Sequence, residues 1–111
     1  MPLAQYTLIW YILNVIVSFG DQATEDMFHG MSSKKALRAV PVDLWRVSQR
    51  KLDMLHAAQD LIDLRVPPNN RLESLREDLE GYYSIRINVQ YRLIFKWAPG
   101  SASEVQIVDY H

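Results

Sequence analysis

Residues 82–97, YYSIRINVQYRLIFKW, decide the fold of this chain. Apolar and polar side chains alternate on both sides of a short segment at 88–90, and the apolar set is Ile85, Ile87, Leu93 and Phe95. Period-two alternation around a tight turn is typical of a β-hairpin that buries one face. We therefore predict two antiparallel strands whose apolar face packs under helices.

The opposite face of this predicted hairpin is basic. Arg86, Arg92 and Lys96 occupy the alternate positions, so we expect them on the solvent side of the sheet, as is common in antiparallel sheets. An open face that carries arginines and tyrosines is a candidate surface for nucleic acid. For Arg92 the alternative is a cross-strand ion pair, the more common role of an arginine in a strand.

The remaining pattern adds helices and strands on both sides of the hairpin. We expect a strand at 15–19, a short helix at 21–29 capped by Asp21, a longer helix at 41–58, a short strand at 71–75 and a final strand at 104–110. Residues 31–40 are expected to form a basic loop, and residues 66–70, VPPNN, a loop within one domain. This order predicts an α+β fold of two layers, in which an N-terminal strand and two helices pack on an antiparallel sheet.

Composition narrows the classes of function. A chain of 111 residues, 49% hydrophobic and 23% charged, suits one globular domain. It has no cysteine, which excludes disulfides, a thiol nucleophile and zinc sites that use sulfur, and is compatible with a reducing cytoplasm. The net charge of −1 gives no general argument for binding nucleic acid. Residues 81–97, however, contain basic residues and no Asp or Glu. The charge pattern alone favours an ordinary solvated surface over a basic binding face.

The first fourteen residues form an extension outside the predicted fold. Residues 8–17 are nearly all apolar, but this stretch is shorter than the ~20 residues of a membrane span. It lacks a positive leader and a small-residue cleavage site, so a signal peptide is not expected. A short anchor, a partner-binding segment and sequence translated upstream of the natural start all stay open, and we favour the last.

The chain ends in Asp109, Tyr110 and His111. An imidazole beside a carboxylate and a phenol is a candidate group for proton transfer near neutral pH, although a terminal histidine taken alone is more often simply solvated. His29 and His56 show no metal-ligand spacing with each other or with His111. The sequence therefore predicts no metal site and no cofactor.

Several segments in order resemble one family of proteins. They are Ser33-Lys34-Lys35, the helix from Gln49-Arg50-Lys51-Leu52, and the stretches 63–68 (DLRVPP), 70–75 (NRLESL), 83–88 (YSIRIN), 90–97 (QYRLIFKW) and 108–111 (VDYH). Together they resemble the HigB toxins of the RelE superfamily, from bacterial type II toxin–antitoxin systems. The resemblance covers residues 15–111, which we take as the toxin domain, and leaves residues 1–14 outside it.

This resemblance implies a cytoplasmic, ribosome-dependent endoribonuclease that cuts mRNA and stops translation. It also implies a HigA-type helix-turn-helix antitoxin as partner, operator DNA reached only through that antitoxin, and no membrane. By position, the catalytic residues would be Asp109, Tyr110, His111, Arg92, Gln90 and Arg76. Further candidate RNA contacts are Arg86, Lys96, Arg71 and Lys51.

These residue types suit RNA cleavage without a metal, in which the substrate's own 2′-hydroxyl attacks the adjacent phosphate. Arg92 and Arg76 would stabilise the phosphorane charge, because a guanidinium fork matches phosphate oxygens. His111 is the preferred acid or base, and Asp109 would orient it or act as the base. Tyr110 would stack on a base or donate a hydrogen bond, and Gln90 would fix the substrate pose.

The chain departs from the family pattern at three places. Val89 stands where the turn usually has an acid, Glu77-Asp78-Leu79 replaces a stretch resembling Gly-Asp-Arg, and Arg76 stands where lysine is frequent. The added acids keep open an alternative from another class, a catalytically inactive relative that only binds antitoxin or RNA. A third hypothesis is a small protein tethered to a membrane through residues 8–17.

Overall fold

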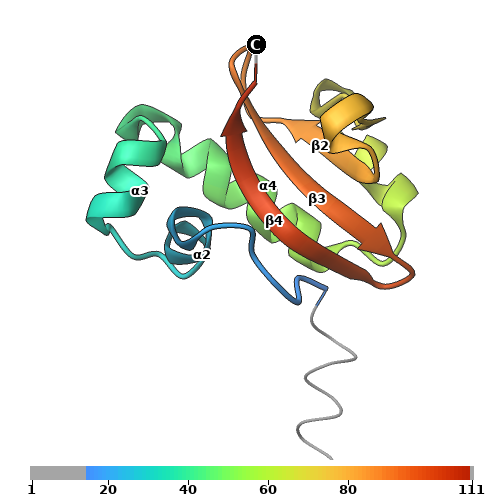
Figure 1. Ribbon diagram of the computed structural model, residues 1–111, viewed down its shortest axis with the longest axis horizontal. Helices are drawn as coiled ribbons and strands as arrows, with labels where there is room; N and C mark the ends of the chain where they lie inside the picture. Colours follow the sequence, from blue (N-terminus) through green and yellow to red (C-terminus); the bar gives the residue numbers. More distant parts are fainter. Residues whose placement is uncertain (1–14, 111) are drawn as a thin grey trace, which may run out of the picture.

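The computed structural model describes residues 15–110, so the predicted extension at 1–14 and His111 lie outside the described residues. The elements form two layers, helices on one side and a four-stranded antiparallel sheet on the other (Figure 1). The helices are α2 (Gln22–Phe28), α3 (Lys34–Ala39) and α4 (Trp45–Ala57), and the strands are β1 (Glu73–Ser74), β2 (Tyr82–Arg86), β3 (Tyr91–Ala98) and β4 (Ser101–Asp109). The strands are ordered β1-β2-β3-β4, which confirms the predicted α+β class.

The hairpin of β2 and β3 forms in the predicted register. Ile85 pairs with Leu93, and both are fully buried in the core cluster that also holds the helix residues Leu52 and Leu55. The turn is closed by Asn88, whose Oδ1 accepts hydrogen bonds from the backbone of Gln90 at 2.9 Å and of Tyr91 at 2.7 Å. An asparagine that bonds its own backbone two residues on is a common turn device.

The opposite face of the sheet is only partly open. Residues directly paired in an antiparallel sheet share a face, and Arg86 pairs with Arg92 on the face away from the core, as predicted. On the same face Ser84 pairs with Ile94, and these two are 0% and 2% exposed. Leu75, which follows β1, is buried as well, and neither it nor Ile94 belongs to the core cluster. The face therefore has a buried centre with basic ends.

The prediction of a basic loop at 31–40 is wrong, because this segment contains α3. Ser33 caps the helix by accepting a hydrogen bond from the backbone N–H of Ala36 at 3.1 Å. Ala36 itself is fully buried, so a side-chain cap and one packed residue are enough for a six-residue helix. The two predicted helices do form, α2 behind its Asp21 cap and α4 behind the 3-10 turn η1 (Val42–Leu44).

The predicted N-terminal strand at 15–19 is replaced by two isolated parallel bridges to β4, Ile16 with Ala102 and Phe19 with Val105. The reason is a bulge in β4, where the pairing with β3 shifts by one residue and Glu104 adopts a positive φ of 50°. The bulge interrupts the ladder between the two bridges. The segment still lies along β4 (Figure 1), and Gly20 allows this approach, because a Cβ there would stand 2.9 Å from Oε1 of Gln106.

The segment between α4 and β2 is more structured than the predicted loop. It contains three 3-10 turns, η2 (Leu61–Arg65), η3 (Pro68–Asn70) and η4 (Glu77–Leu79), and a cis peptide bond before Pro67. The predicted strand at 71–75 shortens to β1, and the final strand starts earlier than predicted, at Ser101. Within residues 15–110, no helix is long and apolar enough to cross a membrane.

Candidate active site

The end of β4 is tied to the start of β3. Tyr91 pairs with Asp109 in the sheet register. Beyond the strand, the backbone N–H of Tyr110 donates to the carbonyl of Gln90 at 2.6 Å, and Nε2 of Gln90 donates to Oδ2 of Asp109 at 3.0 Å. Two of the predicted terminal residues and the predicted hairpin glutamine therefore meet in one place. His111 lies outside the described residues, so its role stays a prediction.

Arg92 is held in place on several sides. Its Nη1 lies 2.9 Å from Oε1 of Glu73 and also donates to Oγ of Ser84 and, at 3.4 Å, to the carbonyl of Arg71. Its guanidinium carbon lies 5.6 Å from the centre of the Tyr110 ring, within the range of a cation–π contact. The guanidinium is thus preorganised beside the last described residue of the chain, as a group that stabilises phosphate charge needs to be.

Two hollows flank Tyr110. One, of about 320 Å³, is lined by Arg71, Arg86, Asn88, Val89, Arg92 and Tyr110. The other, of about 280 Å³, is lined by Glu73, Ser74, Leu75, Arg76, Glu77 and Tyr110. The first has three guanidinium groups and no acid in its lining, which suits a phosphate group. The second combines one arginine with two carboxylates, so the acidic stretch singled out in the sequence does reach the site.

Lys96, predicted as an RNA contact, is not brought to this site. It stands four residues along β3 from Arg92, about 13 Å at the usual rise of a strand. Its Nζ forms an ion pair with Glu104 at 2.9 Å and lies 5.3 Å from the centre of the Tyr82 ring. The hydrogen bond and charge of Glu104 raise the pKa of Lys96. The lysine is therefore engaged by its neighbours at the far end of the sheet.

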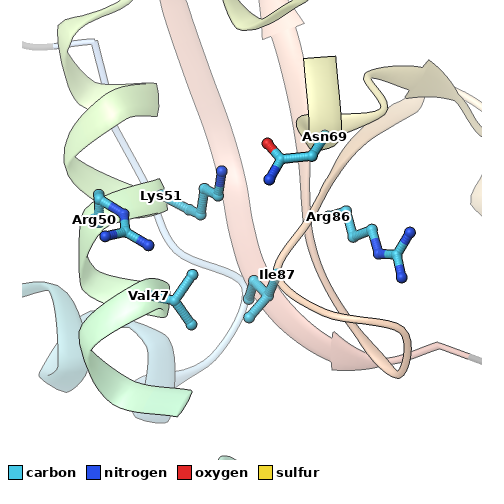
Figure 2. Close-up of a pocket in the computed structure, with 6 residues that line it drawn as sticks. All are labelled: Val47, Arg50, Lys51, Asn69, Arg86 and Ile87. Carbon is cyan, nitrogen blue, oxygen red and sulfur yellow. The ribbon is translucent and has the colours of Figure 1, made fainter. Parts of the chain in front are cut away.

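Lys51, also predicted as an RNA contact, is 5% exposed and does not stand on an open surface. It lines a third hollow, of about 370 Å³, between α4 and the end of β2, with Val47, Arg50, Asn69, Arg86 and Ile87 (Figure 2). Its Nζ donates to Oδ1 of the buried Asn70 at 2.5 Å. Burial and, second, the charge of Arg50 lower the pKa of Lys51.

The sequence reasoning missed Glu73 and Ser84, the two side chains that hold Arg92. Ser84 could have been found, because it alternates with Arg86 on the same face of the hairpin. Glu73 could not, because it reaches Arg92 only through the pairing of the two-residue strand β1 with β2. Among residues 15–110, no three His, Asp or Glu side chains are grouped so that they could hold a metal ion.

A family described as the RelE-like toxin of the type II toxin–antitoxin system HigB matches residues 13–111 of this chain. The chain belongs to this HigB-like toxin family. It is 43% identical to the toxin HigB-1 of Vibrio cholerae over 86 residues, which are 78% of this chain and 87% of that protein. It is also 50% identical over 58 residues to an uncharacterized protein of Haemophilus influenzae, covering 52% of this chain and 57% of the other.

Among solved structures, a YoeB/ParE toxin from Agrobacterium tumefaciens is similar with a TM-score of 0.47 and 16% identity, covering 87% of this chain and 98% of its own. Membership of the HigB-like family confirms the resemblance drawn from the ordered segments of the sequence. The chain is thus the toxin of a type II system, and its family implies an antitoxin partner.

Proposed function

We propose that this HigB-like toxin is a ribosome-dependent endoribonuclease of the cytoplasm that cleaves mRNA without a metal ion. The observation that carries the proposal is the placement of Arg92, fixed under the Tyr110 ring at the edge of a hollow that also has Arg71 and Arg86. Three guanidinium groups around one small hollow provide a site for a phosphodiester and for the extra charge of its transition state.

In the proposed reaction the 2′-oxygen loses its proton and bonds to the adjacent phosphorus, while the bond from phosphorus to the 5′-oxygen breaks. The products are a 2′,3′-cyclic phosphate and a 5′-hydroxyl, and the leaving oxygen takes up a proton. Arg92 stabilises the phosphorane, and Arg76, which lines the hollow on the other side of Tyr110, assists it in the proposed reaction. Positioned groups of this kind each contribute about a hundredfold or more to such a rate.

The proton transfers are assigned to the end of the chain. His111 remains the preferred acid or base because its ordinary pKa lies near neutrality. Gln90 binds Asp109 at 3.0 Å and so positions the strand end that leads to the histidine. Tyr110 presents its ring to a nucleobase, since its residue is 39% exposed.

The partners follow from the same proposal. The substrate is mRNA held on the ribosome, and the inhibitor is a HigA-type helix-turn-helix antitoxin. Operator DNA is contacted only through that antitoxin.

The test is cleavage of a defined mRNA by purified toxin, with and without ribosomes, in the presence of a metal chelator compatible with ribosome integrity. We expect cuts only with ribosomes, and their loss in Arg92→Met and His111→Ala. The matched controls are Arg38→Met and His29→Ala, which make the same types of substitution in the α2–α3 region. Both variants should cleave mRNA normally. Cleavage that is equal in His111→Ala and in the unaltered toxin removes the proposed role of the terminal histidine.

A second candidate is an inactive relative that only binds antitoxin or RNA, and one observation favours it. The carboxylate of Glu73 pairs with Nη1 of Arg92, where a phosphate oxygen of the substrate would otherwise bind. Bound but uncut mRNA on toxin-loaded ribosomes would decide for this candidate.

A further inference from the structure

Lys51 is a buried lysine that has no carboxylate partner among residues 15–110. It is 5% exposed, and within residues 15–110 no carboxylate lies in ion-pair range of it. Its hydrogen bond goes to a neutral group, the amide oxygen of Asn70. Lysine is almost never buried to this extent unless it is paired, because a buried charge without a partner is costly. The position therefore suits an anion, and none of residues 15–110 supplies one.

Asn70 fixes the direction of this ammonium group. The asparagine is fully buried, and its Nδ2 donates to the carbonyl of Leu64 at 2.9 Å and contacts the sulfur of Met54 at 3.2 Å. These contacts leave Oδ1 directed toward Lys51. The lysine is thus held before any ligand arrives, which reduces the ordering cost of binding.

The hollow beside Lys51 is basic on all its charged walls. Arg50 from α4 and Arg86 from β2 line it together with the amide of Asn69, and its lining has no acid. Figure 2 shows the Nζ of Lys51 and the amide of Asn69 directed into the space between α4 and the end of β2, while the Arg86 side chain extends away from α4. Burial, and second the charge of the neighbouring Arg50, lowers the pKa of Lys51.

This basic hollow adjoins the candidate active site. Arg86 lines it on one side and lines the hollow of Arg92 and Tyr110 on the other. A single strand of RNA presents one phosphate per nucleotide, and grooves that follow it place cations along the backbone. We infer that the hollow between α4 and β2 binds a backbone phosphate of the RNA strand next to the scissile one, with Lys51 and Arg50 as donors and Asn70 as the positioning residue. The inference rests on the proposed function for its substrate class.

The experiment measures binding apart from cleavage. A 2′-O-methyl RNA heptanucleotide, which has no free 2′-hydroxyl to attack, is titrated into the purified full-length toxin over a range of salt concentrations. Lys51→Met and Arg50→Met should each weaken binding about tenfold, the worth of one charge-assisted hydrogen bond. Each should also lower the slope of log affinity against log salt by about 0.7, one phosphate contact on a single strand.

Arg38→Met is the control, since Arg38 is exposed on α3 and lines neither hollow. It should keep both the affinity and the salt slope. Unchanged affinity and slope in the Lys51 and Arg50 variants would overturn the inference. If Lys51→Met does not fold, the Arg50→Met variant tests the inference by itself, because Arg50 is exposed.

A second readout uses inorganic phosphate and thermal unfolding. Phosphate should raise the unfolding midpoint of the unaltered toxin and of Arg38→Met, and it should raise that of Lys51→Met less, because only the hollow of Arg92 still binds it there. An equal rise in all three proteins overturns the inference. Failure of the proposed function looks different, namely no cleavage on ribosomes while Lys51-dependent RNA binding persists.

Discussion

Glu73 and Arg92 form an ion pair across the outer face of the sheet, with Oε1 and Nη1 2.9 Å apart. The glutamate is half exposed, while the arginine side chain is 12% exposed. We expect this carboxylate to neutralise the guanidinium in the absence of RNA and to compete with phosphate for it. The ion pair should therefore affect the affinity of the candidate site for RNA.

Glu73→Gln should therefore bind RNA more tightly. Half-exposed ion pairs of this kind are worth about 0.2–1 kcal/mol, so we expect a gain of about 1.4-fold to fivefold in affinity for the 2′-O-methyl RNA. Ser84 and the carbonyl of Arg71 would still hold the arginine. The measurement is a titration at low salt, where surface charges are least screened.

The control for this change is Glu77→Gln, which removes a carboxylate from the same hollow without removing the partner of Arg92. It should change the affinity less than Glu73→Gln does. Weaker binding by Glu73→Gln would show instead that the carboxylate is needed to place Arg92.

The ring of Tyr110 should contribute more to the affinity for RNA than its hydroxyl group does. The ring contacts the guanidinium of Arg92 and lines both hollows. Base stacking on an aromatic ring is worth about 1–3 kcal/mol, so Tyr110→Leu should weaken binding of the 2′-O-methyl RNA by about fivefold to about 150-fold. Tyr110→Phe keeps the ring and should stay close to the unaltered toxin in the same titration. Equal losses in the two variants would assign the contribution to the hydroxyl group.

The sequence predicted the hairpin well because its information is local. Alternation from Ile85 to Phe95 sets the register, and that register places Arg92 next to the end of β4. The isolated bridges of the N-terminal segment depend instead on the bulge at Glu104, nearly ninety positions away in the chain. No local pattern around residues 15–19 carries that information.

Lys51 shows a different limit of sequence reasoning. The buried residues of α4 are Ser48, Lys51, Leu52 and Leu55, which is the i, i+3, i+4, i+7 spacing of an inward face. From the sequence, a lysine within that spacing is assigned to the polar face of the helix. The sequence therefore does not predict that Lys51 is buried. The partner that holds it, Asn70, lies in a segment predicted only as a loop.

Ser48 gives a prediction on stability. Its Oγ is buried and has no hydrogen-bond partner among the described residues. An unsatisfied buried hydroxyl group costs about 1–3 kcal/mol, so Ser48→Ala should raise the free energy of unfolding, by up to about 1 kcal/mol after the loss of packing. Urea unfolding followed by circular dichroism measures it, with the exposed Ser74→Ala as control. A lower midpoint for Ser48→Ala would mean that a water satisfies the hydroxyl group.

His56 makes stability depend on pH. Its Nδ1 accepts a hydrogen bond from the backbone N–H of Ile16 at 3.2 Å, and its ring packs edge-on against Phe28. Burial lowers the pKa of His56 below the ordinary 6.5, and the charge of Asp53 offsets this only in part. The unfolded chain therefore takes up the proton first, so stability is complete above pH 6.5 and decreases as the pH falls toward the lowered pKa of the folded state.

Protonation of Nδ1 also removes the acceptor of the Ile16 N–H, which attaches the N-terminal segment to α4. Urea unfolding at about pH 8 and about pH 5, the range in which histidine titrates, should show the loss. His56→Gln should flatten this dependence, since glutamine offers an acceptor that does not titrate, whereas His29→Gln should keep it. The same loss of stability at low pH in His56→Gln would place the responsible proton on another group.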